Sequence, residues 1–181
     1  MISHSDAMID IETIATSTDA AIITIAAVRF DALNADKAMQ TLELLIDVDN
    51  AIDVWKLDVD PGTIDWWGKQ SKAAQYAAFE KGPRLTLDDA LAKLSKFVGG
   101  ATRLWCQGMN FDPVILDNAY RAVGQPSPWM YYSWRDSRTI MSLFTDLPKK
   151  SGTAHNAVDD AIWQAEMVQT CLNRLNVEKL R

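Results

Sequence analysis

The sequence predicts a mixed α/β domain whose sheet is antiparallel on one side, parallel on the other and flanked by helices. Three strand-like segments in succession, residues 8–13, 21–30 and 42–48, predict an antiparallel meander. Helical segments then alternate with a short apolar strand, as in βα crossover units. Hydrophobic residues make up 48% and charged residues 23% of the 181, as in soluble globular proteins. We therefore expect a single domain over residues 1–181.

Two kinds of strand pattern support the predicted meander. Residues 8–13 alternate apolar and polar side chains, and residues 21–30 are rich in β-branched and small apolar side chains. The polar residues 15–19 separate these segments, which predicts a hairpin. Residues 42–48, with the sequence LELLIDV, predict the third strand after a polar stretch.

A change of periodicity after the third strand predicts helices. Asp60 is placed to cap a helix that Pro61 begins and that ends near Lys69, since proline favours the first helical position. Residues 71–80 are rich in alanine and predict a further helical segment, which the sequence Lys-Gly-Pro at 81–83 ends.

A helix, a strand and another helix are predicted next. Thr86 and Asp89 resemble a capping box, which predicts a helix that ends at the glycines of 99–100. Residues 103–107 are mostly apolar and predict a buried strand. The proline that opens residues 113–123 predicts a helix there, so this strand and helix form the βα half of a crossover.

The last third of the chain predicts one irregular loop and two helices. Residues 124–134 contain two prolines and predict a loop with a short strand in it. Residues 136–145 and 157–174 predict helices. In a sheet of this kind, functional residues are expected to gather at one rim.

The charge balance bears on the class of partner. With 18 basic and 24 acidic residues the net charge is −6, which argues against nucleic-acid binding through a broad basic surface. It leaves open an enzyme that engages a phosphodiester through metal ions held by carboxylates. The sequence has no apolar run of the roughly 18–20 residues that span a bilayer and no secretory start, so we expect a cytoplasmic protein without membrane contact. Cys106 and Cys171 lie in no metal-ligand spacing and are predicted to be free thiols.

Two carboxylates lie on the first predicted strand and a third follows a later strand. Asp10 and Glu12 are two residues apart, so their side chains point to the same face of the sheet. Taken alone, that pattern is typical of the solvent face of an edge strand. Asp112 comes directly before a proline and is predicted to be a helix N-cap, although metals also collect where strands end and helices begin.

The start of the last predicted helix holds the remaining candidates. Asp159 and Asp160 lie in its first turn, where the helix dipole favours acidic residues in any case. His155 is one of two histidines in the chain, and histidine is the residue type most often used as a general base near neutral pH, although a lone histidine is more often structural.

Taken together, these residues occur in the order Asp-x-Glu, Asp and His-x4-Asp, and the chain resembles the DEDDh exonucleases of the ribonuclease H-like superfamily. The resemblance spans residues 8–161 and includes residues 134–139. Its three motifs are Asp10-Ile11-Glu12-Thr13, Asn110-Phe111-Asp112 and His155-Asn156-Ala157-Val158-Asp159-Asp160-Ala161. Within the family, the stretch Trp66-Trp67-Gly68-Lys69-Gln70 is similar to compact members such as the nuclease domain of exonuclease VIII.

The resemblance implies a metal-dependent 3'–5' exonuclease that uses two Mg²⁺ or Mn²⁺ ions and releases nucleoside 5'-monophosphates from DNA or RNA. Asp10, Glu12 and Asp160 would hold the ion that activates water, and Asp10 and Asp112 the ion that faces the leaving oxygen. His155 would take the proton from the water. The implied partner is single-stranded or 3'-ended nucleic acid, and the resemblance suggests a dimer or higher homo-oligomer. The alternative is a catalytically silent nuclease-like domain that binds a protein or nucleic acid.

Substrate-binding candidates come from the aromatic residues and from the matched motifs. The chain has seven tryptophans, and bases stack on aromatic rings without sequence preference. Trp66 and Trp67 are the candidates for stacking, whereas Trp105 and Trp163 are predicted to pack in the core. The remaining substrate-binding candidates, which lie in motifs of the resemblance, are Thr13, Asn110 and Arg138.

Regular helix geometry and the family pattern select different aspartates. On an ideal helix, His155 would share a face with Asp159, four residues on, whereas the family pattern selects Asp160. Both hold only if His155 precedes the regular helix. We therefore expect Asn156 to be the cap and the helix to begin near Ala157.

Overall fold

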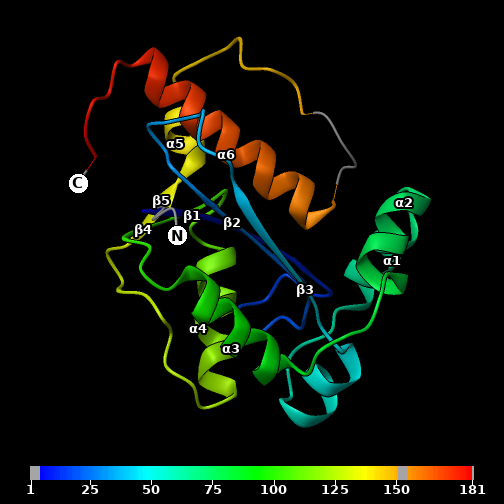
Figure 1. Ribbon diagram of the computed structural model, residues 1–181. Helices are drawn as coiled ribbons and strands as arrows, with labels where there is room; N and C mark the ends of the chain where they lie inside the picture. The colour runs from blue at the N-terminus through cyan, green and yellow to red at the C-terminus, as the bar shows by residue number, and fades with distance from the viewer. Residues whose placement is uncertain (1–4, 151–154, 181) are drawn as a thin grey trace.

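The computed structural model describes residues 5–150 and 155–180, which form a five-stranded sheet with helices on both faces (Figure 1). The strands lie in the order β3-β2-β1-β4-β5. β1 pairs antiparallel with β2 and parallel with β4, β2 pairs antiparallel with β3, and β4 pairs parallel with β5. The predicted mixed sheet is therefore confirmed. The strands are β1 Asp6–Thr13, β2 Ile22–Phe30, β3 Gln40–Leu45, β4 Arg103–Cys106 and β5 Trp134–Asp136.

β1 lies at the centre of the sheet, between β2 and β4. Because side chains alternate along a strand, Ile9 and Ile11 belong to the core on one face, whereas Met8 belongs to the core on the other. Asp10 and Glu12 share the face of Met8 and are the only partly exposed residues of the strand. The interpretation of these carboxylates as the solvent face of an edge strand is wrong, because α6 covers that face.

Three helices cover the sheet (Figure 1). Helices α3 (Leu87–Val98) and α4 (Asp112–Ala122) pack on one face. Helix α6 (Ala157–Arg174) packs on the other face and contacts β1 and β2, with the short α5 (Ser137–Met141) beside it. Helix α6 has the predicted bounds, because the Asn156 side chain caps it by accepting a hydrogen bond from the Asp159 N–H at 3.1 Å.

Shorter helices follow the meander. As predicted, Asp60 caps α1 (Pro61–Gly68), and its carboxylate accepts hydrogen bonds from the Gly62 and Thr63 N–H groups. The predicted helical segment at 71–80 forms α2 (Lys72–Gln75), which continues into the wider π-type turn η2 (Tyr76–Glu80). A second such turn, η1 (Asn50–Val54), follows β3.

Some local predictions are wrong. Thr86 is the N-cap of α3 and the helix ends before Gly99, as predicted, but the Thr86 side chain makes no capping bond. The Asn50 side chain accepts the hydrogen bond of the Leu87 N–H at 3.0 Å. Helix α5 covers only part of the predicted 136–145, and β5 begins at the last residue of the predicted loop.

Residues 5–150 and 155–180 contain neither a membrane-spanning helix nor a disulfide. No helix among residues 5–150 and 155–180 is long and apolar enough to cross a membrane. Cys106 and Cys171 are free thiols, as predicted, and both are buried. Burial raises the pKa of the Cys106 thiol to about 12, so this thiol is unreactive at neutral pH.

Candidate active site

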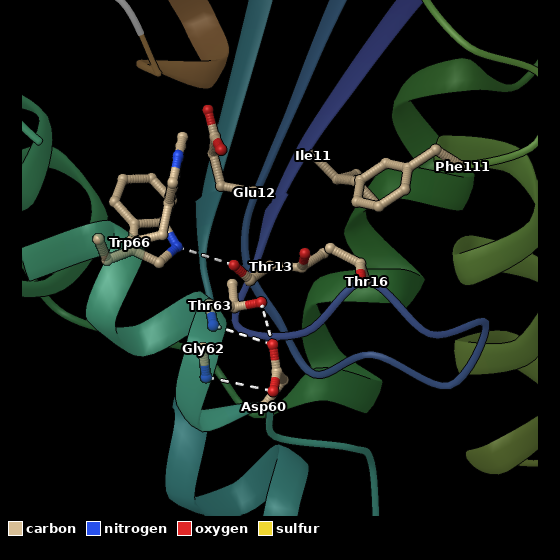
Figure 2. Close-up of a pocket in the computed structure, with 10 residues that line it drawn as sticks. Ile11, Glu12, Thr13, Thr16, Asp60, Gly62, Thr63, Trp66 and Phe111 are labelled. Atoms are coloured by element: carbon tan, nitrogen blue, oxygen red, sulfur yellow. Dashed lines mark hydrogen bonds between the residues drawn. The ribbon is translucent and has the colours of Figure 1, made fainter. Parts of the chain in front are cut away.

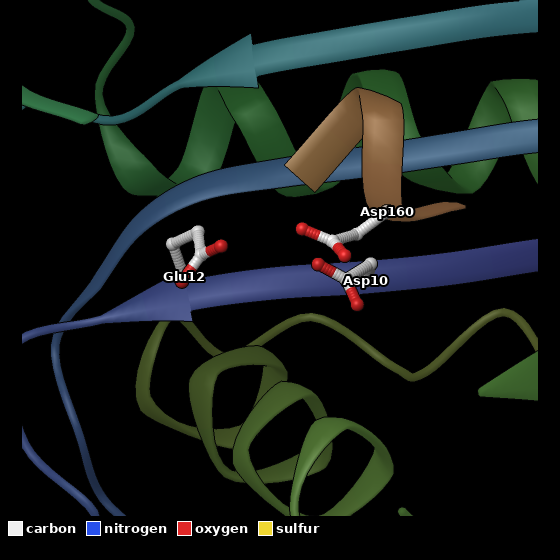
Figure 3. A group of neighbouring side chains, drawn as sticks. All are labelled: Asp10, Glu12 and Asp160. Carbon is white, nitrogen blue, oxygen red and sulfur yellow. The ribbon is translucent and has the colours of Figure 1, made fainter. Parts of the chain in front are cut away.

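Three carboxylates from two distant segments converge at one point on the α6 face of the sheet. Asp10 and Glu12 come from β1, and Asp160 comes from the first turn of α6 (Figure 3). One carboxylate oxygen from each lies within 4.8 Å of the others. Because the Asn156 cap fixes where α6 begins, the helical phase brings Asp160 into this group.

Asp112 joins the group through the backbone of β1. It is only 6% exposed, and its Oδ1 accepts a hydrogen bond from the Ile11 N–H at 3.1 Å. Ile11 lies between Asp10 and Glu12, so the bond places the Asp112 carboxylate beside them. The predicted N-cap role is wrong: Phe111 occupies the cap position, and Asp112 is already the first residue of α4.

Burial and neighbouring charges raise the pKa of three of these carboxylates, Asp10, Glu12 and Asp112. Burial and then the charges of Asp112, Glu12 and Asp160 raise the pKa of Asp10 well above its ordinary value. Burial, followed by the charges of Asp160 and Asp112, raises the pKa of Glu12 to about 8. Burial also raises the pKa of Asp112 to about 7. At neutral pH such a group is stable only with bound protons or cations.

The donor set fits a hard divalent cation. All four groups offer carboxylate oxygens, the ligands that Mg²⁺ and Mn²⁺ prefer. The cluster already attracts a cation from the chain, because the Lys150 ammonium pairs with the Asp160 carboxylate. The spacing of Asp10, Glu12 and Asp160 would allow them to share one such ion, and Asp112 lies beside them.

His155 lies beside the carboxylates but outside the regular helix. Its φ of 59° is left-handed, and α6 begins two residues later, as expected from the sequence. The imidazole packs edge-on against Trp66, with ring centroids 4.7 Å apart. It also lines a small cavity together with Glu12, so its ring lies at the same corner of the sheet.

A cavity of about 370 Å³ opens next to Glu12, between α1 and the end of β1 (Figure 2). Trp66, which is 40% exposed, lines this cavity on the side of α1, and Phe111 lies across from it. Its polar lining includes Thr13, Thr16 and Asp60. Thr16 and Phe111 line the cavity but were not among the substrate-binding candidates. The sequence offered a signal for Phe111, because it precedes Asp112 within the second motif.

The other substrate-binding candidates lie in different environments. Trp67 is 2% exposed, and its Nε1–H donates to the Thr13 carbonyl at 2.9 Å, so it supports the cavity wall. Asn110 is exposed and does not line the cavity. Arg138 is exposed, and its guanidinium lowers the pKa of Asp112, so it lies on the Asp112 side of the cluster.

The two tryptophans assigned to the core differ. Trp105 is buried, as predicted, and its Nε1–H donates to Asp6 at 2.9 Å. Trp163 is only partly buried and lines a surface cavity of about 600 Å³ with other residues of α6. The prediction that Trp163 packs in the core is therefore wrong. Helical spacing turns Trp163 away from the sheet, whereas the next residue, Gln164, faces it.

Mn²⁺ is expected to raise the melting temperature more at pH 8 than at pH 6. Glu12 and Asp112 have pKa values of about 8 and about 7 in the folded chain, against roughly 4 when unfolded. Between those values the folded chain binds more protons, so the metal-free protein loses stability as the pH rises. Metal binding competes with these protons and gains as they leave. Thermal melts with EDTA and with Mn²⁺ at both pH values test this, and an equal rise at both would contradict it.

Comparisons with known proteins give matches over most of the chain. Residues 5–172 match the family model of the 3'-5' exoribonuclease Rv2179c-like domain. An "Exodeoxyribonuclease" of Enterobacteria phage T4 is 24% identical over 206 residues, which cover 92% of this chain and 88% of the phage protein.

Solved structures show the same fold. The nuclease domain of 3'hExo, a DEDDh family member bound to rAMP, matches with a TM-score of 0.64 and 14% identity over 97% of this chain and 94% of its own. S. pombe Pop2p, in a Mg²⁺- and Mn²⁺-bound form, matches with a TM-score of 0.64 and 15% identity over 98% and 86%. Exonuclease X, in complex with 5' overhanging duplex DNA, matches with a TM-score of 0.55 and 14% identity over 94% and 93%. The predicted ribonuclease H-like fold is therefore confirmed.

Proposed function

The chain belongs to the 3'-5' exoribonuclease Rv2179c-like domain family, and we propose that it hydrolyses the terminal phosphodiester at single-stranded 3' ends and releases nucleoside 5'-monophosphates. The family match confirms the exonuclease class predicted from the sequence. It also weighs against a catalytically silent binding domain.

The observation that carries the proposal is the convergence of four carboxylates beside an aromatic-lined cavity. Asp10, Glu12, Asp112 and Asp160 would hold two divalent cations, Mg²⁺ or Mn²⁺. When bound, these cations neutralise the carboxylates, lower the pKa of a water molecule and stabilise the charge that develops on the phosphate. The Mg²⁺- and Mn²⁺-bound form of Pop2p is consistent with this assignment.

The chain's own aromatic residues would hold the 3'-terminal nucleotide. The cavity beside Glu12 offers Trp66 and Phe111 for stacking on a base, which is worth roughly 1–3 kcal/mol per base and tolerates any sequence. This mode of binding suits a protein with a net charge of −6. Thr13 would line the nucleotide site, and Asn110 and Arg138 would contact the substrate outside the cavity.

The decisive experiment measures the direction and products of degradation. Matched RNA and DNA oligonucleotides, labelled at the 5' end, are incubated with Mn²⁺ or Mg²⁺ in single- and double-stranded form. We expect shortening from the 3' end, release of nucleoside 5'-monophosphates and no reaction in EDTA. Circular single strands serve as the control and should stay intact. Cleavage of the circles, or no shortening with either metal, would refute the proposal.

His155 is proposed to accept the proton of the attacking water on an imidazole nitrogen. Replacement by Ala is expected to lower kcat about 10²–10⁴-fold, the usual contribution of a positioned base. Because His155 also packs on Trp66, a His155→Gln variant, which keeps a polar side chain, separates lost packing from lost base catalysis. Wild-type turnover in both variants would remove His155 from the mechanism.

A further inference from the structure

Gln164 is a buried polar residue next to the acidic cluster and has no role in the function proposed above. It lies on α6, four residues after Asp160, so both side chains leave the same face of the helix. It is 3% exposed, and its Nε2–H donates to Asp10 Oδ1 at 2.8 Å. Helix α6 therefore sends two side chains to the centre of β1: one carboxylate and one amide donor.

The hydrogen bond fixes one oxygen of the most crowded carboxylate. Asp10 faces the charges of Glu12, Asp112 and Asp160, and this repulsion favours rotation of its carboxylate away from the cluster. A donor on Oδ1 restricts that rotation and leaves Oδ2 for other partners. Because the amide is neutral, it restrains Asp10 without supplying positive charge that would compete with a bound cation.

The amide oxygen of Gln164 also indicates that this side chain serves Asp10 and not the packing of the helix. Its Oε1 is buried and has no hydrogen-bond partner among residues 5–150 and 155–180, whereas its Nε2 donates to Asp10. Buried amides that serve the fold normally satisfy both ends. Gln169, on the same helix and 6% exposed, contacts the backbone instead of the cluster: its Nε2 donates to the Asp31 carbonyl at 2.8 Å and so holds the segment after β2.

We propose that Gln164 is a positioning residue that holds the Asp10 carboxylate in the orientation needed to bind the catalytic cation. This inference rests on the proposed function, since it assumes that Asp10 is a metal ligand. Residues that orient metal ligands typically change metal affinity or activity 10–100-fold when they are replaced.

The test compares Gln164→Met and Gln164→Leu with the matched control Gln169→Met. Calorimetric titration with Mn²⁺, without substrate, gives the Kd of each folded protein, and oligonucleotide degradation at saturating Mn²⁺ gives kcat and KM. We expect both Gln164 variants to raise the Mn²⁺ Kd and lower kcat by about 10–100-fold, with KM unchanged. The Gln169 variant should melt at a lower temperature and keep the wild-type Kd and kcat.

Three outcomes overturn the inference, and one of them also removes the proposed function. If both Gln164 variants keep the wild-type Kd and kcat, the residue does not position Asp10. If Gln169→Met causes the same losses, the effect is one of helix packing. If the wild-type protein binds no Mn²⁺ and degrades no oligonucleotide, the proposed function fails together with the inference.

Discussion

Replacement of Asp112 by Asn is expected to lower kcat on the order of 10³-fold and to leave the metal-free protein as stable as before or more stable. Charge stabilisation by a bound cation is worth several kcal/mol, and each ~1.4 kcal/mol is tenfold in rate. The asparagine oxygen can still accept the Ile11 hydrogen bond, so the contact with β1 survives. Asp10→Asn is expected to behave in the same way, since its amide oxygen can still accept from Gln164.

The sign of the stability effect follows from the pKa values. Burial raises the pKa of Asp112 to about 7, so at pH 8 the folded chain holds an ionised group in an unfavourable place. The asparagine variant removes that charge, and its melting temperature in EDTA should equal or exceed that of the wild type. The rise in melting temperature on addition of Mn²⁺ should shrink at the same time.

Asp117→Asn is the matched control on the same helix. Asp117 accepts hydrogen bonds from the Ser127 hydroxyl and from the Trp129 Nε1–H, at 2.6 and 2.9 Å, away from the cluster. An asparagine oxygen can still accept both bonds, so its replacement should leave kcat and the metal-induced rise in melting temperature unchanged. If Asp112→Asn instead kept near-wild-type kcat and only lowered the melting temperature, Asp112 would be a purely structural residue.

Local signals in the sequence predicted the features that depend on neighbouring residues. The Asn156 cap and the start of α6 depend on residues within one helical turn, and so does the Asp60 cap of α1. Strand patterns likewise predicted β1 and β2, and the order of the motifs selected the four carboxylates that the structure brings together.

Features that depend on distant segments could not be predicted in this way. Alternation along β1 does not distinguish a solvent face from a face covered by a helix that itself carries polar groups. The bond from Ile11 to Asp112 and the bond from Gln164 to Asp10 join residues 101 and 154 positions apart. Both require the strand order of the sheet and the rotation of α6, which no single segment encodes.

Asp160→Asn is expected to lower Mn²⁺-dependent kcat on the order of 10³-fold, whereas Asp159→Asn should stay near the wild-type value. Asp160 belongs to the acidic group with Asp10 and Glu12, whereas Asp159 does not. The two residues are neighbours in the first turn of one helix, so each change removes the same favourable interaction with the helix dipole. The pair therefore separates metal binding from helix stability.

The result depends on the geometry at the start of α6. Since His155 is left-handed at φ 59° and Asn156 caps the helix, the helical spacing that would pair His155 with Asp159 does not apply. The Mn²⁺ Kd should rise with the loss of kcat in Asp160→Asn, and both should be unchanged in Asp159→Asn. The reverse pattern would mean that in solution α6 begins one residue earlier or is rotated by about one residue, which would also separate Gln164 from Asp10.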